Sequence, residues 1–298
     1  MALLTRLGDG DARAILAPFD LELESLEPLP AHGTVNSNFR VRASGASFFL
    51  RVNEGKREAD VRAEAALVAR LAARGVPTPE PLGVIAFGEK WVTLFPWVPA
   101  REARALDDVE VAGEALGRIH AARLDGELPR NHYSLDELER RLEGFAGDAR
   151  FAEVVPALAR ELGAARARSR GPEGLIHQDL FPDNVLVGDR GELRCVLDFE
   201  QATRGPLIYD LAVTLNAWCW DGATIVRDAA ERLIAAYERQ VGPVAERALL
   251  VEECRLAAAR FTITRITDVF LPENVDEDLR RRKDWRDYAR RLSHWTAV

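Results

Sequence analysis

Residues 175–187 read LIHQDLFPDNVLV, and this stretch decides the fold that the sequence predicts. An apolar run ends in a short polar loop that carries Asp179, and Asn184 opens a second apolar run five residues later. The turn GDRG at 188–191 follows, and the next strand-like run delivers the acidic triplet DFE at 198–200. Two apolar runs joined by a glycine-rich turn are typical of a pair of strands.

This order of polar side chains meets the needs of phosphoryl transfer. The reaction needs a carboxylate that orients the attacking hydroxyl and accepts its proton, and it needs hard oxygen ligands that hold Mg²⁺ against phosphates. The spacing matches that of a kinase catalytic loop and its metal-binding aspartate. We therefore predict Asp179 as the catalytic base and Asn184 and Asp198 as metal ligands. A plain polar loop between core strands is the alternative, and the complete ordered set disfavours it.

His177 lies beside this set but has no nucleophile next to it in the sequence. We therefore expect it to brace the loop.

Composition restricts the class of protein. The chain has 298 residues, of which 47% are hydrophobic, which is enough for a large core. The net charge of −8 disfavours nucleic-acid and membrane partners unless basic residues are segregated into a patch. The three cysteines form an odd set without metal-ligand spacing, so we expect reduced core residues of a cytoplasmic protein. We expect no signal peptide and no membrane span.

Strand-like and helical segments fall in different parts of the chain. A helix is expected at 10–17 and another at 57–74, and the strand-like segments around them are 21–26, 38–43, 47–52, 82–87 and 91–95. Helical periodicity then dominates at 108–122, 134–147, 150–168, 223–240 and 246–270, with the strand pair 184–187 and 193–198 among them. We predict an α+β fold of two lobes, with a mixed β lobe at 1–98 and a helical lobe at 99–298.

The catalytic stretch resembles the kinase-like phosphotransferases, which include aminoglycoside phosphotransferases, choline kinases and bacterial homoserine kinases. A narrower resemblance, to the homoserine kinases of this fold, rests on residues 35–39, 176–185, 209–219 and 260–265. The resemblance implies a protein-kinase-like fold and ATP with Mg²⁺ as cofactors. The implied reaction converts L-homoserine to O-phospho-L-homoserine, on the route to threonine. It also implies that Asp210 is structural and ties the catalytic loop to the following helix.

The N-terminal lobe carries the predicted nucleotide-binding residues. The turn with Gly33, Asn36 and Ser37 can cradle phosphate through backbone N–H groups, although an ordinary hairpin turn is the alternative. The Pro96 carbonyl and the Val98 N–H are the predicted contacts to adenine, and a proline-stiffened linker is compatible with the same residues.

Arg51 stands on a strand where kinases of this fold usually place a lysine. A guanidinium keeps the charge and matches phosphate and carboxylate geometry, and the alternative is an exposed strand arginine. Its expected partner is Glu64, which lies on the apolar stripe of the helix 57–74 and therefore needs a cation. Both residues are predicted to belong to the nucleotide site.

The acceptor is expected to bind to the helical lobe. The candidate residues are Asn216, Trp218, Asp221 and Arg265. A carboxylate-bearing acceptor favours a bidentate arginine, and Arg265 lies on an otherwise apolar helix. The alternative for Arg265 is a structural ion pair with Asp210 or Asp268, and tryptophans are more often core than site.

Two rival functions stay open from sequence. The first is a kinase for an aminoglycoside, choline or another amino alcohol, although a polycationic acceptor would want an acidic cluster that the sequence lacks. The second is a non-catalytic nucleotide-binding module, which would not need Asp179, Asn184 and Asp198 together. The oligomeric state is open, with a homodimer as the candidate assembly. The segment 278–291 is expected to be a helix docked through Trp285, Tyr288, Leu292 and Trp295.

Overall fold

The computed structural model describes residues 5–29, 36–124, 126, 128–129, 131–244 and 246–296. The chain divides into two compact units. The small unit comprises Met1–Arg101 and Arg194–Glu200, and the large unit comprises Glu102–Leu193 and Gln201–Val298. The first division lies three residues beyond the predicted boundary near 98, whereas the return of Arg194–Glu200 to the small unit was not foreseen.

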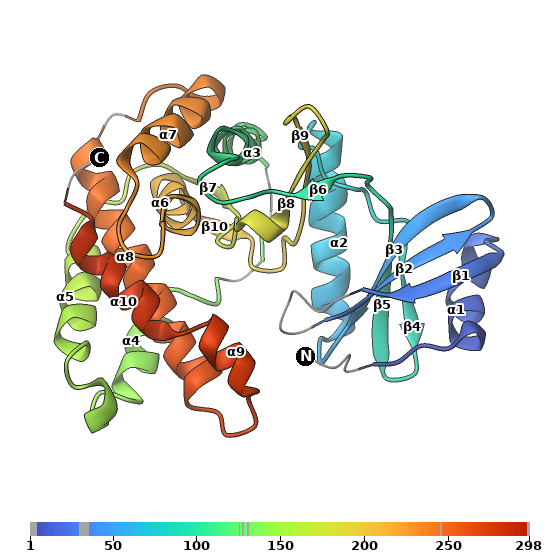
Figure 1. Cartoon of the computed structure of the whole chain (residues 1–298), viewed down its shortest axis with the longest axis horizontal. Coiled ribbons are helices and arrows are strands. Elements are labelled where there is room, and N and C mark those ends of the chain that lie inside the picture. Colours follow the sequence, from blue (N-terminus) through green and yellow to red (C-terminus); the bar gives the residue numbers. More distant parts are fainter. Residues whose placement is uncertain are drawn as a thin grey trace. The chain divides into compact units, whose positions relative to one another are not determined.

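The small unit is built on an antiparallel sheet of five strands in the order β1-β2-β3-β5-β4 (Figure 1). The strands are β1 (Leu23–Pro28), β2 (Ser37–Ala43), β3 (Ala46–Asn53), β4 (Gly83–Phe87) and β5 (Lys90–Pro96). Alternate residues of β2, namely Phe39, Val41 and Ala43, are buried, as are Leu50 of β3 and Leu94 of β5. This two-residue period gives the sheet one apolar face and explains why strand patterning was readable.

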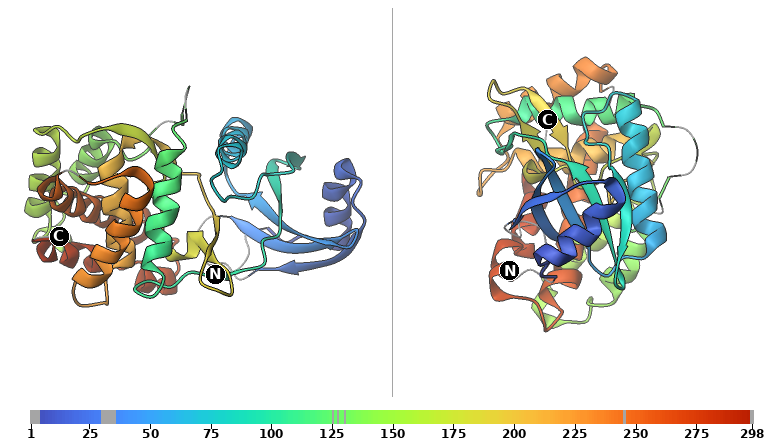
Figure 2. Two further views of the ribbon diagram at one scale, coloured as in Figure 1. Left: turned by 90° about the horizontal axis from the view of Figure 1, so that it is seen from above. Right: turned by 90° about the vertical axis from the view of Figure 1, so that its right-hand side faces the viewer.

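Two α-helices accompany this sheet (Figure 2). They are α1 (Asp9–Leu16), which continues into the 3₁₀ turn η1 (Ala17–Phe19), and α2 (Glu58–Ala73). In α2 the buried residues Val61, Val68 and Leu71 recur at the helical period. The chain then turns at Gly75, whose φ of +81° suits glycine. The segment Arg194–Glu200 joins the small unit through a hydrogen bond from the Val196 N–H to the Pro77 carbonyl.

The large unit is mainly helical. Its helices are α3 (Val109–Ala121), α4 (Leu135–Glu143), α5 (Val155–Arg166), α6 (Leu207–Trp218), α7 (Arg227–Val241), α8 (Arg247–Arg265), α9 (Glu277–Arg282) and α10 (Trp285–His294), with short turns η2 (Ala149–Phe151) and η3 (Pro182–Asn184). The long helix α8 packs against α5, α6 and α10, and α3 packs along α7. Gly113 permits that second contact, because a Cβ there would lie 2.2 Å from the Leu233 carbonyl oxygen.

Short strands carry the catalytic segment. β7 (Glu173–Ile176) pairs with β10 (Thr203–Pro206), and β8 (Val185–Val187) leads into β9 (Leu193–Val196). The turn between β8 and β9 is closed by hydrogen bonds from the Gly188 N–H to the Glu192 carbonyl and from the Gly191 N–H to the Gly188 carbonyl. The chain enters the large unit through β6 (Arg101–Glu102), after which the Ala103 N–H bonds the Val185 carbonyl.

Two sequence predictions about helices need correction. The helix expected at 246–270 is α-helical only as far as Arg265, and η4 (Ile266–Phe270) continues as a π-helix. The tail expected as one helix is two, because the Asp284 carboxylate caps a new helix by accepting from the Arg286 N–H. Its aromatic stripe is buried as predicted.

Cys195, Cys219 and Cys254 are free and buried, as expected. Across the described residues, no helix is both long and apolar enough to cross a membrane.

Candidate active site

A buried carboxylate holds the loop that carries Asp179 through hydrogen bonds. Asp210 of α6 accepts hydrogen bonds from the backbone N–H groups of His177 (2.6 Å) and Gln178 (2.8 Å). His120 of α3 adds a contact of 3.1 Å between its Nε2 and the same carboxylate. Asp210 is therefore structural, as the resemblance implied, and it ties the loop to the helix that follows.

His177 also serves the loop. Its side chain is buried, and its Nδ1 accepts a hydrogen bond from the Asp179 N–H at 3.3 Å. The expectation that His177 braces the loop is confirmed. Gln178 has a φ of +66°, a conformation that residues other than glycine adopt rarely and mostly at functional sites. The loop is held in this shape by the Asp210 carboxylate.

Asp179 and Asn184 lie in the same turn. The Asn184 side-chain amide donates to the Asp179 carbonyl at 2.8 Å, so the amide nitrogen faces the loop and the amide oxygen is the atom suited to a cation. The Asp179 carboxylate accepts from Nε2 of Gln201 at 3.2 Å. The five-residue spacing thus brings the predicted base and the predicted amide ligand together within one loop.

Asp198 belongs to the small unit and is held in an unusual conformation. Its φ is +61°, and its Oδ1 is buried without a hydrogen-bond partner among the described residues. The nearest cation is Arg51, whose Nη1 lies 3.7 Å from that oxygen. A carboxylate oxygen left in this state suits a metal cation.

Arg51 occupies the centre of a charge cluster in the small unit. Its Nη1 donates to Oε1 of Glu64 at 3.1 Å, which confirms the predicted pair. Burial alone would lower the pKa of Arg51, but Asp198, Glu64 and Glu200 together raise it, so its charge is secure. Burial raises the pKa of Glu64, and the cations Arg51 and Lys56 oppose that shift.

Lys56 is a member of this cluster that sequence reasoning missed. Its Nζ contacts the carboxylate of Glu200 and lies 3.7 Å from that of Glu64. Glu200 also accepts from Nδ2 of Asn36 at 3.4 Å. A signal was available, because Lys56 is the only lysine in the stretch 1–89 and lies three residues after the end of β3. The small unit therefore offers two cations, Arg51 and Lys56, to an anion.

The remaining residues that were predicted to bind the nucleotide lie in different environments. Gly33 lies outside the described residues. The Ser37 hydroxyl is buried and donates to Glu54 at 2.8 Å, so it is engaged within the protein. Pro96 ends β5 opposite Phe48 of β3, and Val98 follows it, half-buried. The parts of these residues in ATP binding stay predictions.

Two residues that were predicted to bind the substrate are buried in the core, where their side chains are hydrogen-bonded to other parts of the protein. The Asn216 amide donates to the carbonyls of Ala212 and Cys254, both at 2.9 Å, and accepts from Nε1 of Trp295 at 3.0 Å. Nε1 of Trp218 donates to the Leu180 carbonyl at 2.7 Å. Both side chains are fully buried, so the structure does not support a substrate contact for either.

Asp221 is exposed and closes a turn. Its Oδ1 accepts from the N–H groups of Ala223 (2.8 Å) and Thr224 (2.7 Å), and these bonds lower its pKa. The carboxylate is thus used in a local turn, and its predicted contact to the acceptor has no support in this geometry.

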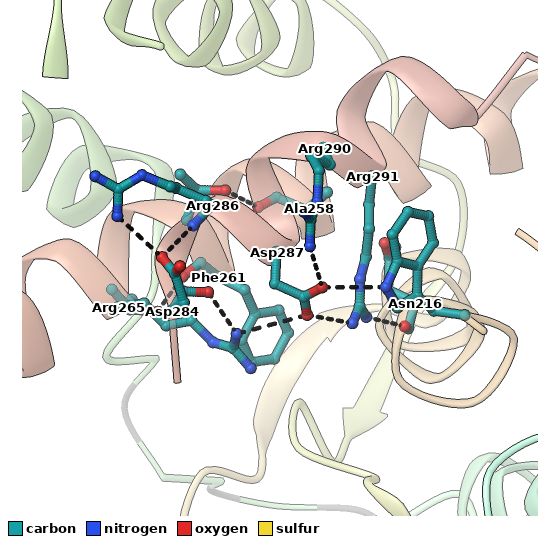
Figure 3. A network of polar contacts seen from close by, with 12 residues as sticks. Asn216, Ala258, Phe261, Arg265, Asp284, Arg286, Asp287, Arg290 and Arg291 are labelled. Atoms are coloured by element: carbon teal, nitrogen blue, oxygen red, sulfur yellow. Dashed lines mark hydrogen bonds and ion pairs between the residues drawn. The ribbon is translucent and has the colours of Figure 1, made fainter. Parts of the chain in front are cut away.

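Arg265 has a structural environment that differs from both sequence predictions (Figure 3). Its Nη1 donates to the Asp284 carbonyl at 2.9 Å and lies 3.8 Å from the Asp287 carboxylate. Its guanidinium also stacks over the Tyr288 ring at 4.4 Å. Arg265 therefore anchors the start of α10 through these residues rather than through Asp210 or Asp268.

A different arginine of the same helix is linked to the predicted base by hydrogen bonds. Nη2 of Arg260 donates to Oε1 of Gln201 at 2.6 Å, and Gln201 in turn donates to Asp179. Lys283 is also close: burial lowers its pKa, and the nearby Asp179 carboxylate opposes that shift. Sequence reasoning missed Gln201, Arg260 and Lys283, although Arg260 lies on the same apolar helix that drew notice to Arg265.

The donor set fits a magnesium ion held mainly by its substrate. The described residues contain no group of three or more His, Cys, Asp or Glu side chains arranged for a metal. Mg²⁺ in phosphoryl-transfer sites is usually held by one or two protein ligands together with phosphate oxygens and water, so no such group is needed. Taken singly, the Oδ1 of Asp198 in the small unit, which has no hydrogen-bond partner among the described residues, and the amide oxygen of Asn184 in the large unit are each the kind of atom that Mg²⁺ prefers.

Comparison with known proteins places the chain in a family. Residues 26–248 match the model of the phosphotransferase enzyme family. A homoserine kinase of Xanthobacter autotrophicus is 33% identical over 100% of this chain and 97% of its own length, and one of Gluconacetobacter diazotrophicus is 35% identical over 98% and 96%.

A solved structure supports the fold. Spectinomycin phosphotransferase in complex with ADP and spectinomycin superposes with a TM-score of 0.70 at 12% identity, covering 95% of this chain and 94% of that one. The predicted α+β, protein-kinase-like fold is thereby confirmed. Because the family model matches more than half of the sequence and the relatives match nearly all of it, the chain belongs to the phosphotransferase enzyme family.

Proposed function

We propose that this protein is an ATP-dependent kinase that phosphorylates the hydroxyl of L-homoserine to give O-phospho-L-homoserine. The observation that carries the proposal is the full-length similarity to homoserine kinases, at 33% and 35% identity. The catalytic loop supports it, because a kinase needs the carboxylate and amide that Asp179 and Asn184 supply.

The residues divide the work between the two units. In the large unit, the Asp179 carboxylate orients the acceptor hydroxyl and takes its proton, while Gln201 holds that carboxylate through the 3.2 Å bond. In the small unit, Arg51 and Lys56 supply positive charge for phosphate oxygens. Asp198 and Asn184 are the proposed Mg²⁺ ligands. When bound, Mg²⁺ would neutralise the charge that develops on the transferring phosphoryl group.

The proposal extends to substrate class and setting. An acceptor with a hydroxyl, an ammonium and a carboxylate is a small amino alcohol, and no nucleic-acid partner is proposed. The cytoplasmic location rests on the three free thiols, and a homodimer stays a prediction.

The test is product identification. Purified protein with Mg·ATP and L-homoserine should release ADP and give a phosphorylated product with one phosphoryl group on the side-chain oxygen, detected by ³¹P NMR and mass spectrometry. Asp179→Asn, which keeps the size of the side chain but loses the proton acceptor, is the matched control. Release of ADP without phosphohomoserine would refute the proposal.

A further inference from the structure

Arg260 of α8 is a buried cation with unsatisfied hydrogen-bond donors. It is 2% exposed, and within the described part of the chain its Nε and Nη1 have no hydrogen-bond partner. These two nitrogens carry three of the five N–H bonds of a guanidinium, a group that stays protonated in proteins. Burying charged donors without partners costs free energy. An anion that accepts hydrogen bonds from these two nitrogens would remove that cost.

The contacts that Arg260 does make leave those donors unused. Its Cζ lies 4.0 Å from the ring centre of Tyr133 and 3.9 Å from that of Phe261. Contacts with ring faces hold the plane of a guanidinium without occupying its N–H bonds. Its one hydrogen bond, from Nη2 to Gln201, takes a single donor on the remaining nitrogen. The guanidinium is therefore fixed in orientation and still able to bind a carboxylate.

Gln201 links this cation to the base through two hydrogen bonds. Arg260 only donates, so the Gln201 amide must turn its oxygen to Arg260 and its nitrogen to Asp179, as observed. One carboxamide group thus separates the guanidinium from the catalytic carboxylate. Homoserine likewise has a short spacer, three carbon atoms, between its hydroxyl and its carboxylate.

A surface hollow is linked to Arg260 through Arg141 and Tyr133. This hollow of about 320 Å³ is lined by Arg140, Arg141, Gly144, Thr267, Asp268 and Leu271. The Arg141 guanidinium lies 5.6 Å from the ring centre of Tyr133, the same ring that contacts Arg260. Tyr133 is half-buried and contacts both Arg141, which lines the hollow, and the buried Arg260.

We propose that Arg260 binds the carboxylate of the acceptor and so selects amino acids over simple amino alcohols. The inference rests on the proposed function, because it assumes an acceptor that carries a carboxylate. It replaces Arg265 in that role, since the Arg265 side chain is engaged with Asp284 and Tyr288.

The test compares two acceptors that differ only in the carboxylate. L-Homoserine carries it, and 3-aminopropan-1-ol keeps the hydroxyl and the amine without it. For Arg260→Lys we expect kcat/KM for L-homoserine to fall by about 10²-fold, because an ammonium cannot reproduce a two-pronged contact. The same variant should change kcat/KM for 3-aminopropan-1-ol by less than about threefold, because that acceptor offers the guanidinium no carboxylate.

Arg265→Lys is the matched control, since both arginines lie on α8 and both stack on aromatic rings. It should affect the two acceptors equally. If Arg260→Lys also affects them equally, Arg260 acts on the base through Gln201 and the inference is overturned. If the wild type makes no phosphohomoserine, the proposed function itself fails, which is a separate result.

Folding is checked by the melting temperature of each variant. Where Arg260→Lys does not fold, Arg260→Gln replaces it. Where neither folds, the wild type decides through dead-end inhibitors. L-2-Aminobutyrate, which is homoserine without its hydroxyl, should then compete with L-homoserine about 10²-fold more strongly than propylamine does. Equal inhibition by the two compounds would overturn the inference.

Discussion

Replacing Asp210 should loosen the catalytic loop and destabilise the whole large unit. Its carboxylate is fully buried and is the acceptor for the His177 and Gln178 N–H groups and for the His120 ring. Asp210→Ala leaves three buried polar groups without their partner. Each such loss costs about 1–3 kcal/mol, so we expect a total of about 3–9 kcal/mol. That is a large part of the usual 5–15 kcal/mol stability of a folded domain.

Asp210→Asn should be milder. The amide keeps one acceptor oxygen but turns an NH₂ group toward a donor, so a loss of about 1–3 kcal/mol is expected. Thr214→Val on the same helix is the control, because it removes only the hydroxyl bond to the Asp210 carbonyl and should cost about 1 kcal/mol. Urea unfolding measures all three variants.

The same carboxylate gives a pH dependence with a defined sign. Burial alone would raise the pKa of Asp210, but hydrogen bonds and charge from His120 and His177 lower it overall. Because the pKa of Asp210 is lower in the folded state, its ionised carboxylate stabilises the protein at pH values above the unfolded-state pKa of about 3.9. This stabilisation is lost as the pH falls below about 3.9 and through the folded-state pKa. The wild type should therefore lose stability faster than Asp210→Asn in this acid range. An Asp210→Ala protein as stable and as active as the wild type would refute the reasoning.

Four further substitutions test the chemistry. Asp179→Asn should lower kcat by about 10²–10⁴-fold with little change in the KM for ATP, as measured by coupled ADP release, and near-normal turnover would reject it as the base. Asp198→Ala should abolish activity at ordinary Mg²⁺ concentrations, and full activity of this variant would place the metal elsewhere. Asn184→Ala should lose less, and part of its activity should return as the Mg²⁺ concentration is raised. Arg51→Lys should raise the KM for ATP about tenfold because an ammonium cannot span Glu64 and Asp198 together, and an unchanged KM would contradict that role.

The catalytic loop, the five strands of the small unit's sheet and the pair β8 and β9 were predictable because their signals are local, whereas β6, β7 and β10 were not predicted. Asp179 and Asn184 lie five residues apart on one turn, so their spacing fixes their proximity. The partner of Arg51 was also predictable, because Glu64 sits on the buried stripe of a helix and a buried charge needs an opposite one. The buried aromatic stripe of the C-terminal segment followed from its helical period.

The acceptor residues were not predictable, because their environment depends on distant parts of the chain. Nothing in the local sequence shows that Asn216 meets Cys254 and Trp295. Arg260 and Arg265 stand on one apolar helix and look alike in sequence. Only the fold shows that Arg265 has a carbonyl partner, whereas two nitrogens of Arg260 find no hydrogen-bond partner among the residues that the structure describes.

The central claim is that the acceptor is L-homoserine, and a competition experiment tests it most directly. L-Homoserine, choline and kanamycin are mixed at equal concentration with limiting Mg·ATP, and the phosphorylated products are quantified by mass spectrometry. Because product ratios in such a mixture report the ratios of kcat/KM, we expect phosphohomoserine to account for nearly all of the product. Phosphocholine or phosphokanamycin as the main product would contradict the homoserine assignment while leaving the phosphotransferase family intact.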